Sequence, residues 1–264
     1  MRTGRLVSVL AAVAVPAVTL SASPVLAAAP PPAQTTTLCV PGEHMTVHSL
    51  SGPRFTLRND YWLGQRPQCL TNNDHLPSFR VTQRAGFDHL GRVVAFPNVF
   101  YGCSWRVCSP GTVLPMQVTK LSRPQVTWQT KESARGQYNA AFDIWFGKTA
   151  MTTGQADGAE LMIWLNTHFL PPCVGPKIWI RHGRYCVEHW VAHHKGVPVT
   201  WNYIQFRRLS RTTGVSHLRL HPFIRAAERR GWVQPTWWME NIEAGFEIWS
   251  GGQGLATTNF AAKA

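Results

Sequence analysis

One acidic residue lies in a run of sequence that otherwise predicts a buried strand. In residues 158–166, the alternation of a strand places three aliphatic side chains on one face and Glu160, Met162 and Trp164 on the other. An acid, a soft apolar side chain and an aromatic ring on one face are typical of a groove that stacks on a sugar ring and carries out acid/base or nucleophilic chemistry. A core strand with its Glu at the solvated end explains these residues equally well, so other parts of the chain must decide.

Three further acids are embedded in apolar, strand-like runs. Alternation places Glu243 and Glu247 on one face of a strand over residues 241–249, and it places Asp143 opposite its apolar neighbours in a strand over residues 138–146. If these strands lie beside the strand of Glu160, the carboxylates converge in one trough, where crowding raises the pKa of one acid and leaves another ionised. A glycosidase needs such a pair, one acid to protonate the leaving oxygen and one carboxylate to attack the anomeric carbon. Apart from Asp60, which lies beside two aromatic residues, the remaining acids are predicted to be solvated: Glu43, Asp74, Asp88, Glu132, Asp157, Glu188, Glu228 and Glu240.

Short β-branched and aromatic runs separated by Gly, Pro, Asn and Asp predict the elements that position these acids. The runs cover residues 55–58, 92–96, 126–128, 138–146, 178–180, 200–206 and 241–249. This pattern is typical of an all-β sandwich or barrel. One segment differs, because residues 222–230 have helical periodicity, begin with a proline and stop at Gly231, so we expect a single short helix outside the sheets.

The N-terminal region predicts export. Residues 1–29 combine two arginines, an apolar run and small residues, which matches a secretory signal peptide, and the run is too short for a membrane span. Residues 30–37 are rich in Pro and Thr and predict a disordered tether. We expect residues 38–264 to form one catalytic domain of a secreted, extracellular protein that is not held in a membrane once the signal peptide is removed.

The chain is strongly basic. Its formal charge of +13 falls to +11 when the two arginines of the predicted signal peptide are subtracted. Arginines cluster in residues 207–211 and 225–230, yet the chain has no nucleic-acid-binding motif, so we do not expect a nucleic acid partner. We expect the charge to promote loose adhesion to anionic cell-wall material.

The six cysteines predict disulfides, because an even number in an exported chain is typical of an oxidising compartment. Several pairings are possible, and closeness in sequence favours Cys103 with Cys108, Cys173 with Cys186, and Cys39 with Cys69. His189, His193 and His194 come nearest to a metal motif, but their surroundings predict a solvated face. We expect neither a metal nor a cofactor.

Several ordered motifs resemble glycoside hydrolase family 12. They are YNAAFDIWF at residues 138–146, ELMIWLN at 160–166 and EAGFEIWSGG at 243–252, while residues 97–108 and 234–237 resemble the actinobacterial branch of the family. The resemblance implies a β-jelly-roll sandwich of two antiparallel sheets, with an open cleft for β-1,4-glucans on the concave sheet. It also implies a secreted endo-β-1,4-glucanase that hydrolyses cellulose-like, mixed-linkage or xyloglucan polysaccharides with retention.

The resemblance assigns roles to individual residues. Glu160 matches the nucleophile, Glu247 the general acid/base and Asp143 the acid that hydrogen-bonds near the nucleophile, and Met162 belongs to the same motif as Glu160. Trp62 matches a tryptophan that stacks on a sugar in the donor subsites. Asn202 aligns with a cleft asparagine, and Glu243 is the alternative to Glu247 if the register differs.

The chain departs from the family pattern at three places. Asp60 and Leu63 replace the second Asn and the Gly of an Asn-Asn-x-Trp-Gly motif, so donor-side hydrogen bonding should differ, because a carboxylate only accepts where an amide also donates. An insertion bracketed by Cys173 and Cys186 should reshape one end of the cleft.

A non-catalytic glycan-binding sandwich is the alternative to a monomeric enzyme whose partner is a β-glucan polysaccharide. Both would show a groove lined by Trp. The pair of Glu160 and Glu247 discriminates between them, because a binding module gains nothing from burying two carboxylates.

Overall fold

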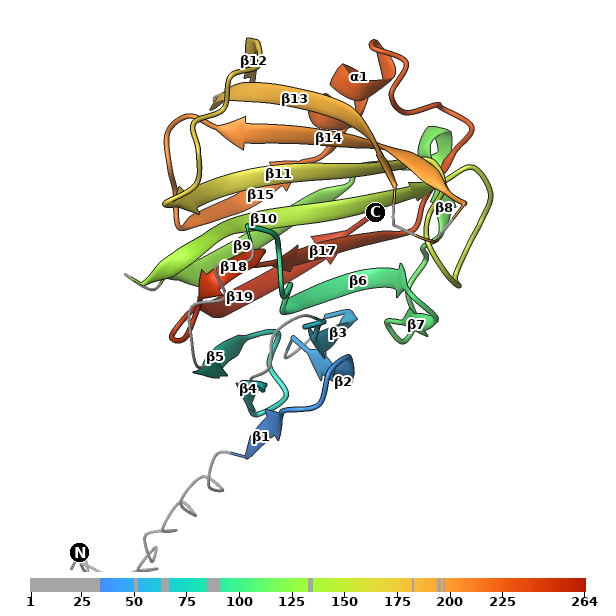
Figure 1. The fold of residues 1–264 in the computed structure, drawn as a ribbon. Helices are drawn as coiled ribbons and strands as arrows, with labels where there is room; N and C mark the ends of the chain where they lie inside the picture. The colour runs from blue at the N-terminus through green and yellow to red at the C-terminus, as the bar shows by residue number, and fades with distance from the viewer. Residues whose placement is uncertain are drawn as a thin grey trace, which may run out of the picture. The chain divides into compact units, whose positions relative to one another are not determined.

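The computed structural model describes residues 34–49, 52–62, 67–84, 91–132, 135–181, 183–193, 196 and 198–264. The predicted signal peptide, the first residues of the predicted tether, Leu63, Asp88 and His194 lie outside these residues. Residues 33–264 form one compact unit, whose described residues form two β-sheets, one α-helix and one short 3-10 helix, η1 (Val118–Lys120) (Figure 1). In the described part of the chain, no helix is both long and apolar enough to cross a membrane.

The smaller sheet has six strands in the order β1-β4-β5-β19-β9-β15. They are β1 (Thr35–Leu38), β4 (Gln68–Asn73), β5 (Phe79–Arg84), β19 (Ala256–Lys263), β9 (Gln125–Lys131) and β15 (Gly214–Arg219). β1 corrects the prediction that residues 30–37 are a disordered tether, because Thr35, Thr36 and Thr37 pair antiparallel with β4. Their β-branched side chains suit a strand, and the ladder satisfies their backbone groups.

The larger sheet has 13 strands, nine of them in the order β12-β13-β14-β11-β10-β17-β6-β3-β2. Its strands are β2 (Glu43–His48), β3 (Arg54–Asn59), β6 (Asn98–Ser104), β7 (Val107–Cys108), β8 (Met116–Gln117), β10 (Gly136–Gly147), β11 (Ala159–His168), β12 (Lys177–Ile180), β13 (Gly183–His193), β14 (Thr200–Arg208), β16 (Trp238–Met239), β17 (Asn241–Gly245) and β18 (Ile248–Gly251). The pairs are antiparallel except for β11 with β14, which is parallel.

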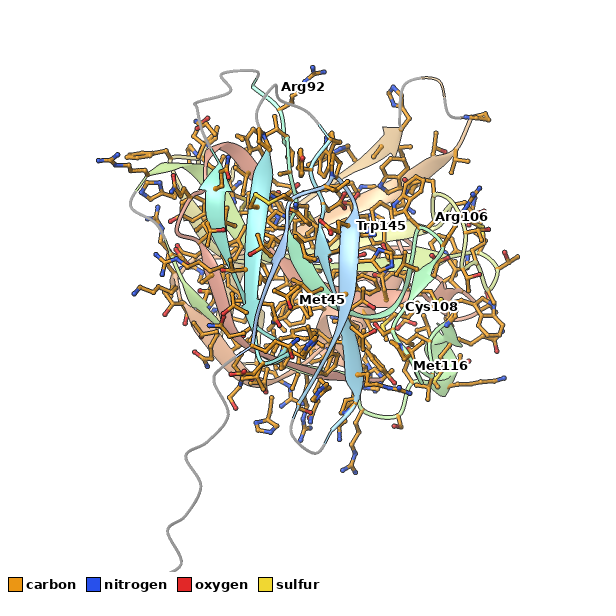
Figure 2. All side chains as sticks on the ribbon, turned by 90° about the horizontal axis from the view of Figure 1, so that it is seen from below. Met45, Arg92, Arg106, Cys108, Met116 and Trp145 are labelled. Atoms are coloured by element: carbon orange, nitrogen blue, oxygen red, sulfur yellow. A yellow bond between two sulfur atoms is a disulfide. The ribbon has the colours of Figure 1, made fainter. Side chains whose placement is uncertain are left out.

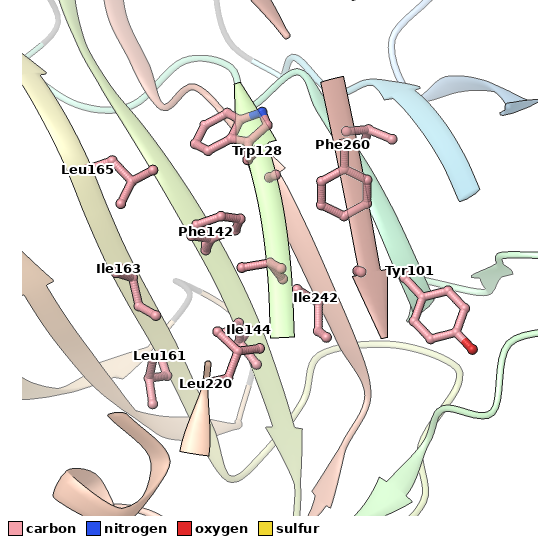
Figure 3. Close-up of a cluster of buried hydrophobic side chains, with 14 of the residues drawn as sticks. Tyr101, Trp128, Phe142, Ile144, Leu161, Ile163, Leu165, Leu220, Ile242 and Phe260 are labelled. Atoms are coloured by element: carbon pink, nitrogen blue, oxygen red, sulfur yellow. The ribbon is translucent and has the colours of Figure 1, made fainter. Parts of the chain in front are cut away.

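The core lies between the two sheets. Figure 3 shows aliphatic residues of β11 and Phe142 of β10 in one cluster with Trp128 of β9 and Phe260 of β19. The ring centroids of Trp128 and Phe142 are 5.2 Å apart. Burial of such large side chains stabilises each by about 1.5–3 kcal/mol relative to exposure. The core takes the aliphatic face of β11, which leaves the face of Glu160 turned away from the smaller sheet.

The single α-helix, α1 (His221–Glu228), confirms the prediction of a helix over residues 222–230, with a slightly earlier end. Figure 1 shows it beside β13 and β14. Its buried Phe223 packs edge-to-face on Tyr185 of β13 and Phe206 of β14. The helix thus packs its apolar face on the core-facing side of β13 and β14.

Two strand predictions need correction, whereas the disulfide prediction is confirmed. Residues 92–96 contribute only an isolated bridge at Ala95, and the strand over 241–249 is interrupted after Gly245. The alternation survives the interruption, since Phe246 and Ile248 both point into the core. All three favoured cysteine pairs form disulfides: Cys39–Cys69, Cys103–Cys108 and Cys173–Cys186.

Candidate active site

The three acid-bearing strands are neighbours in the order β11-β10-β17. Asp143 of β10 lies opposite Met162 on one side and opposite Glu243 on the other. Glu160 lies opposite Trp145, two residues further along β10. Because directly opposed residues on a sheet project to the same face, this register brings the acids of three strands together, as the sequence predicts.

Glu247 reaches the same face from the interruption between β17 and β18. Asn139 of β10 holds it there: the Glu247 N–H donates to Asn139 Oδ1 at 3.0 Å, and Asn139 Nδ2 donates to the Glu247 carboxylate. Gly245 allows the chain to pass close to its neighbour, because a Cβ at this position would lie 2.4 Å from the Pro97 carbonyl oxygen. The strand therefore bends where the acid must be presented.

These acids line one cavity of 540 Å³, called here the cleft. Its wall includes the predicted donor-side residues Asp60 and Trp62. It also includes four carboxyl groups and three further indoles: Asp143, Glu160, Glu243, Glu247, Trp105, Trp145 and Trp201. Figure 2, which draws the side chains as sticks, labels Trp145. Trp62 is 51% exposed, so its ring is free to stack on a ligand.

Two indole N–H groups bind carboxylates in the cleft. Trp201 Nε1 donates to Glu160 Oε2 at 2.7 Å, and Trp145 Nε1 donates to Asp143 Oδ2 at 3.0 Å. These donors fix the acids without adding charge. The sequence reasoning missed both tryptophans and Asn139, although the placement of Trp145 on the same strand face as Asp143 was a usable signal.

Burial raises the pKa values of the two central acids. The pKa of Glu160 rises to about 8, chiefly because of burial and then the charge of Glu247, against the lowering effect of the Trp201 hydrogen bond. Burial also raises the pKa of Glu247 to about 7, opposed by the Asn139 hydrogen bond and by Arg207. The two carboxyls titrate as a pair, so near neutral pH the pair retains a proton.

Asp143 completes this crowded group. Burial, followed by the charges of Glu160, Glu243 and Glu247, raises its pKa well above the usual range. Asp143 therefore keeps its proton to a higher pH than an ordinary aspartic acid, and in its protonated form it can donate a hydrogen bond. Its Oδ1 has no hydrogen-bond partner among the described residues.

Arg58 is the cation of the cleft that the sequence reasoning did not single out. Its guanidinium lies 3.1 Å from Glu243 Oε2 and 3.3 Å from Asp60 Oδ2, and both Arg58 and Glu243 are buried. Burial raises the pKa of Glu243 and of Asp60, and Arg58 opposes this rise in both. Asp60 replaces an amide of the family motif and here binds a neighbouring arginine.

Two predicted substrate-binding residues do not line the cleft. Met162 is buried, and its Sδ accepts hydrogen bonds from Tyr203 Oη at 3.0 Å and Trp164 Nε1 at 3.4 Å. Asn202 is next to the residue of β14 that pairs with Glu160, so its side chain projects to the opposite face of the sheet. There its amide is held by His189 and by the Trp232 carbonyl, each at 3.0 Å. The structure therefore brings together Glu160, Glu247, Asp143, Asp60 and Trp62 in the lining of the cleft, and neither Met162 nor Asn202.

Glu240 corrects another expectation, because it is buried rather than solvated. It lies between β16 and β17, where its N–H donates to the Trp145 carbonyl at 2.9 Å and its own carbonyl accepts from Cys103 N–H at 2.9 Å. Its Oε1 has no hydrogen-bond partner in the described residues. Burial, with a contribution from Asp157, raises its pKa to about 8.

A two-sheet jelly roll with several carboxylic acids on one face of its larger sheet defines a class of polysaccharide-hydrolysing proteins. Residues 53–264 match glycosyl hydrolase family 12, and the chain belongs to this family.

Curated relatives are similar over part of the chain. Endoglucanase S of Pectobacterium parmentieri is 28% identical over 171 residues, which cover 60% of this chain and 61% of that protein. The match thus spans less than two thirds of that relative. The probable cellulase Cel12b of Mycobacterium tuberculosis is 25% identical over 158 residues, which cover 58% of this chain and 98% of the relative.

Solved structures share the fold over most of the chain. A metagenome-derived family 12 endoglucanase superimposes with a TM-score of 0.78 at 33% identity, covering 87% of this chain and 97% of the other. Endoglucanase cel12A from Rhodothermus marinus gives a TM-score of 0.77 at 33% identity, covering 86% and 98%. The fold is therefore the β-jelly roll of this family.

Proposed function

We propose that this protein is a secreted, retaining endo-β-1,4-glucanase. The observation that carries the proposal is the pair of Glu160 and Glu247 in one open cavity, each held by its own hydrogen-bond donor. A non-catalytic glycan-binding module would have no use for these acids, because burying carboxyl groups costs stability without improving stacking on sugar.

In the first step, Glu160 attacks the anomeric carbon while Glu247 protonates the departing glycosidic oxygen. The bond from the anomeric carbon to that oxygen breaks, and a glycosyl ester on Glu160 forms. Trp201, which donates to Glu160 at 2.7 Å, holds the attacking carboxylate. Retention requires the two carboxyl groups to stand about 5–5.5 Å apart, with no water between them.

In the second step, Glu247 takes a proton from a water that attacks the same carbon and releases Glu160. The first step, by contrast, requires that the proton of the Glu160–Glu247 pair lies on Glu247 in the free enzyme. Burial raises both pKa values, to about 8 for Glu160 and about 7 for Glu247, so near neutral pH the pair holds a proton that Glu247 can supply. In its protonated form, Asp143 would donate a hydrogen bond to Glu160 and stabilise the charge of that carboxylate.

We further infer that the substrate is a β-1,4-glucan chain, such as soluble cellulose, mixed-linkage glucan or xyloglucan. The half-exposed Trp62 beside the acids provides a sugar platform on the donor side. The names of the relatives, an endoglucanase and a probable cellulase, agree with this substrate class. Such polymers lie outside the cell, which fits the predicted signal peptide at residues 1–29. No step requires a metal or cofactor.

A substrate panel tests the proposal. Wild type and Glu160→Ala should be assayed on carboxymethylcellulose, lichenan, xyloglucan and xylan, with NMR of the first products. We expect wild type to cleave glucans internally and release the β-anomer, and Glu160→Ala to be inactive. An α-anomer would overturn retention, and binding without cleavage by wild type would favour the glycan-binding alternative.

A further inference from the structure

A second hollow, of 670 Å³, shares no lining residue with the cleft. It is formed by α1, the turn between β12 and β13, the end of β15 and the segment before β9. Six arginines line it, and we call it the arginine hollow: Arg123, Arg181, Arg219, Arg225, Arg229 and Arg230.

The charge of the arginine hollow is not compensated by protein groups. No acid is among its lining residues. All six arginines are exposed, and within the part of the chain that the structure describes none of them forms an ion pair. Like charges gathered in one concavity repel one another and focus a positive potential, which an anion from solution would relieve.

The framework that holds these arginines is well anchored. Buried Phe223 docks α1 on the larger sheet with ring centroids 5.1 Å from Tyr185. The Leu220 N–H donates to the Pro124 carbonyl at 2.9 Å, which joins the start of the helix to the segment before β9. The disulfide Cys173–Cys186 ties the chain before β12 to β13. The arginines therefore project from fixed elements, which favours a defined site over a diffuse surface charge.

We propose that the arginine hollow binds an acidic polysaccharide whose sugar rings carry carboxylates, that is, a polyuronide. The planar guanidinium matches a carboxylate with two parallel hydrogen bonds. The lining also includes Trp179, which is 72% exposed, and an exposed indole suits a sugar ring. A phosphate polymer without rings would leave Trp179 unused.

The choice of a polysaccharide over a nucleic acid rests on the proposed function, because a cleft for neutral wall glucans places the protein where acidic wall polysaccharides also occur. The hollow would then hold the enzyme on its substrate matrix while the cleft cleaves the glucan. Since polygalacturonate is not a β-glucan, binding to it and hydrolysis of glucan are measured separately, and either can fail alone.

The test is titration of the full-length secreted protein with polygalacturonate at low salt, with binding measured by calorimetry or affinity electrophoresis. Arg123→Gln/Arg225→Gln/Arg229→Gln removes three charges from the hollow. Arg80→Gln/Arg92→Gln/Lys263→Gln removes three exposed charges elsewhere and is the matched control. We expect the first variant to bind at least about tenfold more weakly, and the control to change affinity less than about twofold, with equal glucanase activity in both and melting temperatures within about 2 °C of each other.

Two competing polymers complete the test. Fully methyl-esterified polygalacturonate keeps the sugar rings but lacks the charges, and we expect it not to bind. Equal loss of binding in both triple variants would overturn the site and leave only a general effect of net charge. Tighter binding to double-stranded DNA than to polygalacturonate at the same salt, lost in the hollow variant, would overturn the polyuronide in favour of a nucleic acid.

Discussion

The cleft and the arginine hollow both crowd like charges, yet they resolve the crowding in opposite ways. In the cleft, Asp143, Glu160, Glu243 and Glu247 lie around one cavity with Arg58 as a buried cation. In the hollow, six exposed arginines face one cavity with no acid in its wall. The acids are removed from bulk water, and the arginines are not.

The difference follows from proton chemistry. A buried carboxyl can lose its charge by binding a proton, which is why the pKa values of these acids are raised. A guanidinium stays protonated in proteins, so arginines can be crowded only where water and counter-ions reach them. The cleft is thereby suited to moving protons, and the hollow to binding anions.

The largest effect should come from removing the carboxyls that exchange protons and bonds. Glu160→Ala should lower kcat on soluble β-glucan by about 10⁴-fold or more, because no group remains to form the covalent intermediate. Glu247→Gln should lower it by about 10²–10⁴-fold, the usual contribution of a general acid. The measurement is initial rates on lichenan.

Leaving-group dependence separates the two roles. With aryl glucosides whose leaving group needs no protonation, glycosyl transfer to the enzyme should be nearly normal in Glu247→Gln and absent in Glu160→Ala. Both variants should melt within a few degrees of wild type, since each removes a carboxyl from a crowded group. Normal turnover of lichenan by either variant would remove that residue from its role.

The next effect concerns the cation that balances the buried acids. Arg58→Met leaves the buried Glu243 and the partly exposed Asp60 without their partner, and breaking the buried ion pair with Glu243 costs about 3–5 kcal/mol. Arg58 lowers the pKa of both acids relative to a cleft without it. The stabilisation of the folded protein by Arg58 is present where the two acids are ionised, above their pKa values, and is lost as the pH falls through them.

Urea unfolding at pH 7.5 and pH 4 measures this contribution. We expect a loss near 3 kcal/mol at the higher pH and a clearly smaller one at the lower pH. Arg58→Met/Glu243→Gln should recover most of the stability, because it removes one of the unpaired acids. An equal loss at both pH values would show that Arg58 stabilises by packing alone.

The contrast between cleft and hollow also separates what sequence can predict from what it cannot. Period-two alternation predicted the faces of Glu160, Asp143, Glu243 and Glu247, because a strand fixes where each side chain points. The sequence did not predict that their strands are neighbours, and the convergence of the carboxylates depended on that assumption. Pairing between distant strands depends on the whole topology. The resemblance to a family supplied the roles, and the sandwich and three disulfides followed from local pattern and spacing.

The failures arise where tertiary neighbours decide the environment. The residues next to Glu240 in the sequence predict a solvated side chain, but β16 and β17 enclose it on folding. Arg58 resembles any charged residue of a strand until Glu243, far along the chain, is placed beside it. The arginine hollow gathers four separate segments, and only Arg225, Arg229 and Arg230 formed a cluster in the sequence.

Glu240 is a buried acid that forms no ion pair with the residues that the structure describes, and its substitution should have a smaller effect. Its pKa of about 8 exceeds the usual value of about 4.3. Folding therefore holds a proton that the unfolded chain loses, and stability falls as the pH rises from about 4.5 to about 8. Glu240→Gln should remove this loss, raising the melting temperature by about 2–4 °C at pH 8.5 and by almost nothing at pH 4.5.

Thermal unfolding of wild type and Glu240→Gln at the two pH values makes this comparison. Glu228→Gln on α1, where the side chain is partly exposed, is the control and should shift the melting temperature by less than about 1 °C at either pH. A gain in Glu240→Gln that is the same at pH 4.5 and pH 8.5 would mean that the ionisation of Glu240 is not its cause.

The smallest effect tests the arginine hollow without any ligand. If its six guanidinium groups repel one another through water, Arg123→Gln/Arg225→Gln/Arg229→Gln should raise the melting temperature by about 1 °C at low ionic strength, as expected for exposed charges worth a few tenths of a kcal/mol. Because added salt screens exposed charges, the gain should vanish at about 0.5 M salt. Arg80→Gln/Arg92→Gln/Lys263→Gln, whose charges lie outside the hollow, should show a smaller gain.

Polygalacturonate should raise the melting temperature of wild type and leave that of the hollow variant nearly unchanged, because only the native hollow gathers enough charge to bind it. If the melting temperature of the ligand-free hollow variant stays raised at high salt, the effect comes from packing or helix propensity. The guanidinium groups of the hollow would then not repel one another measurably.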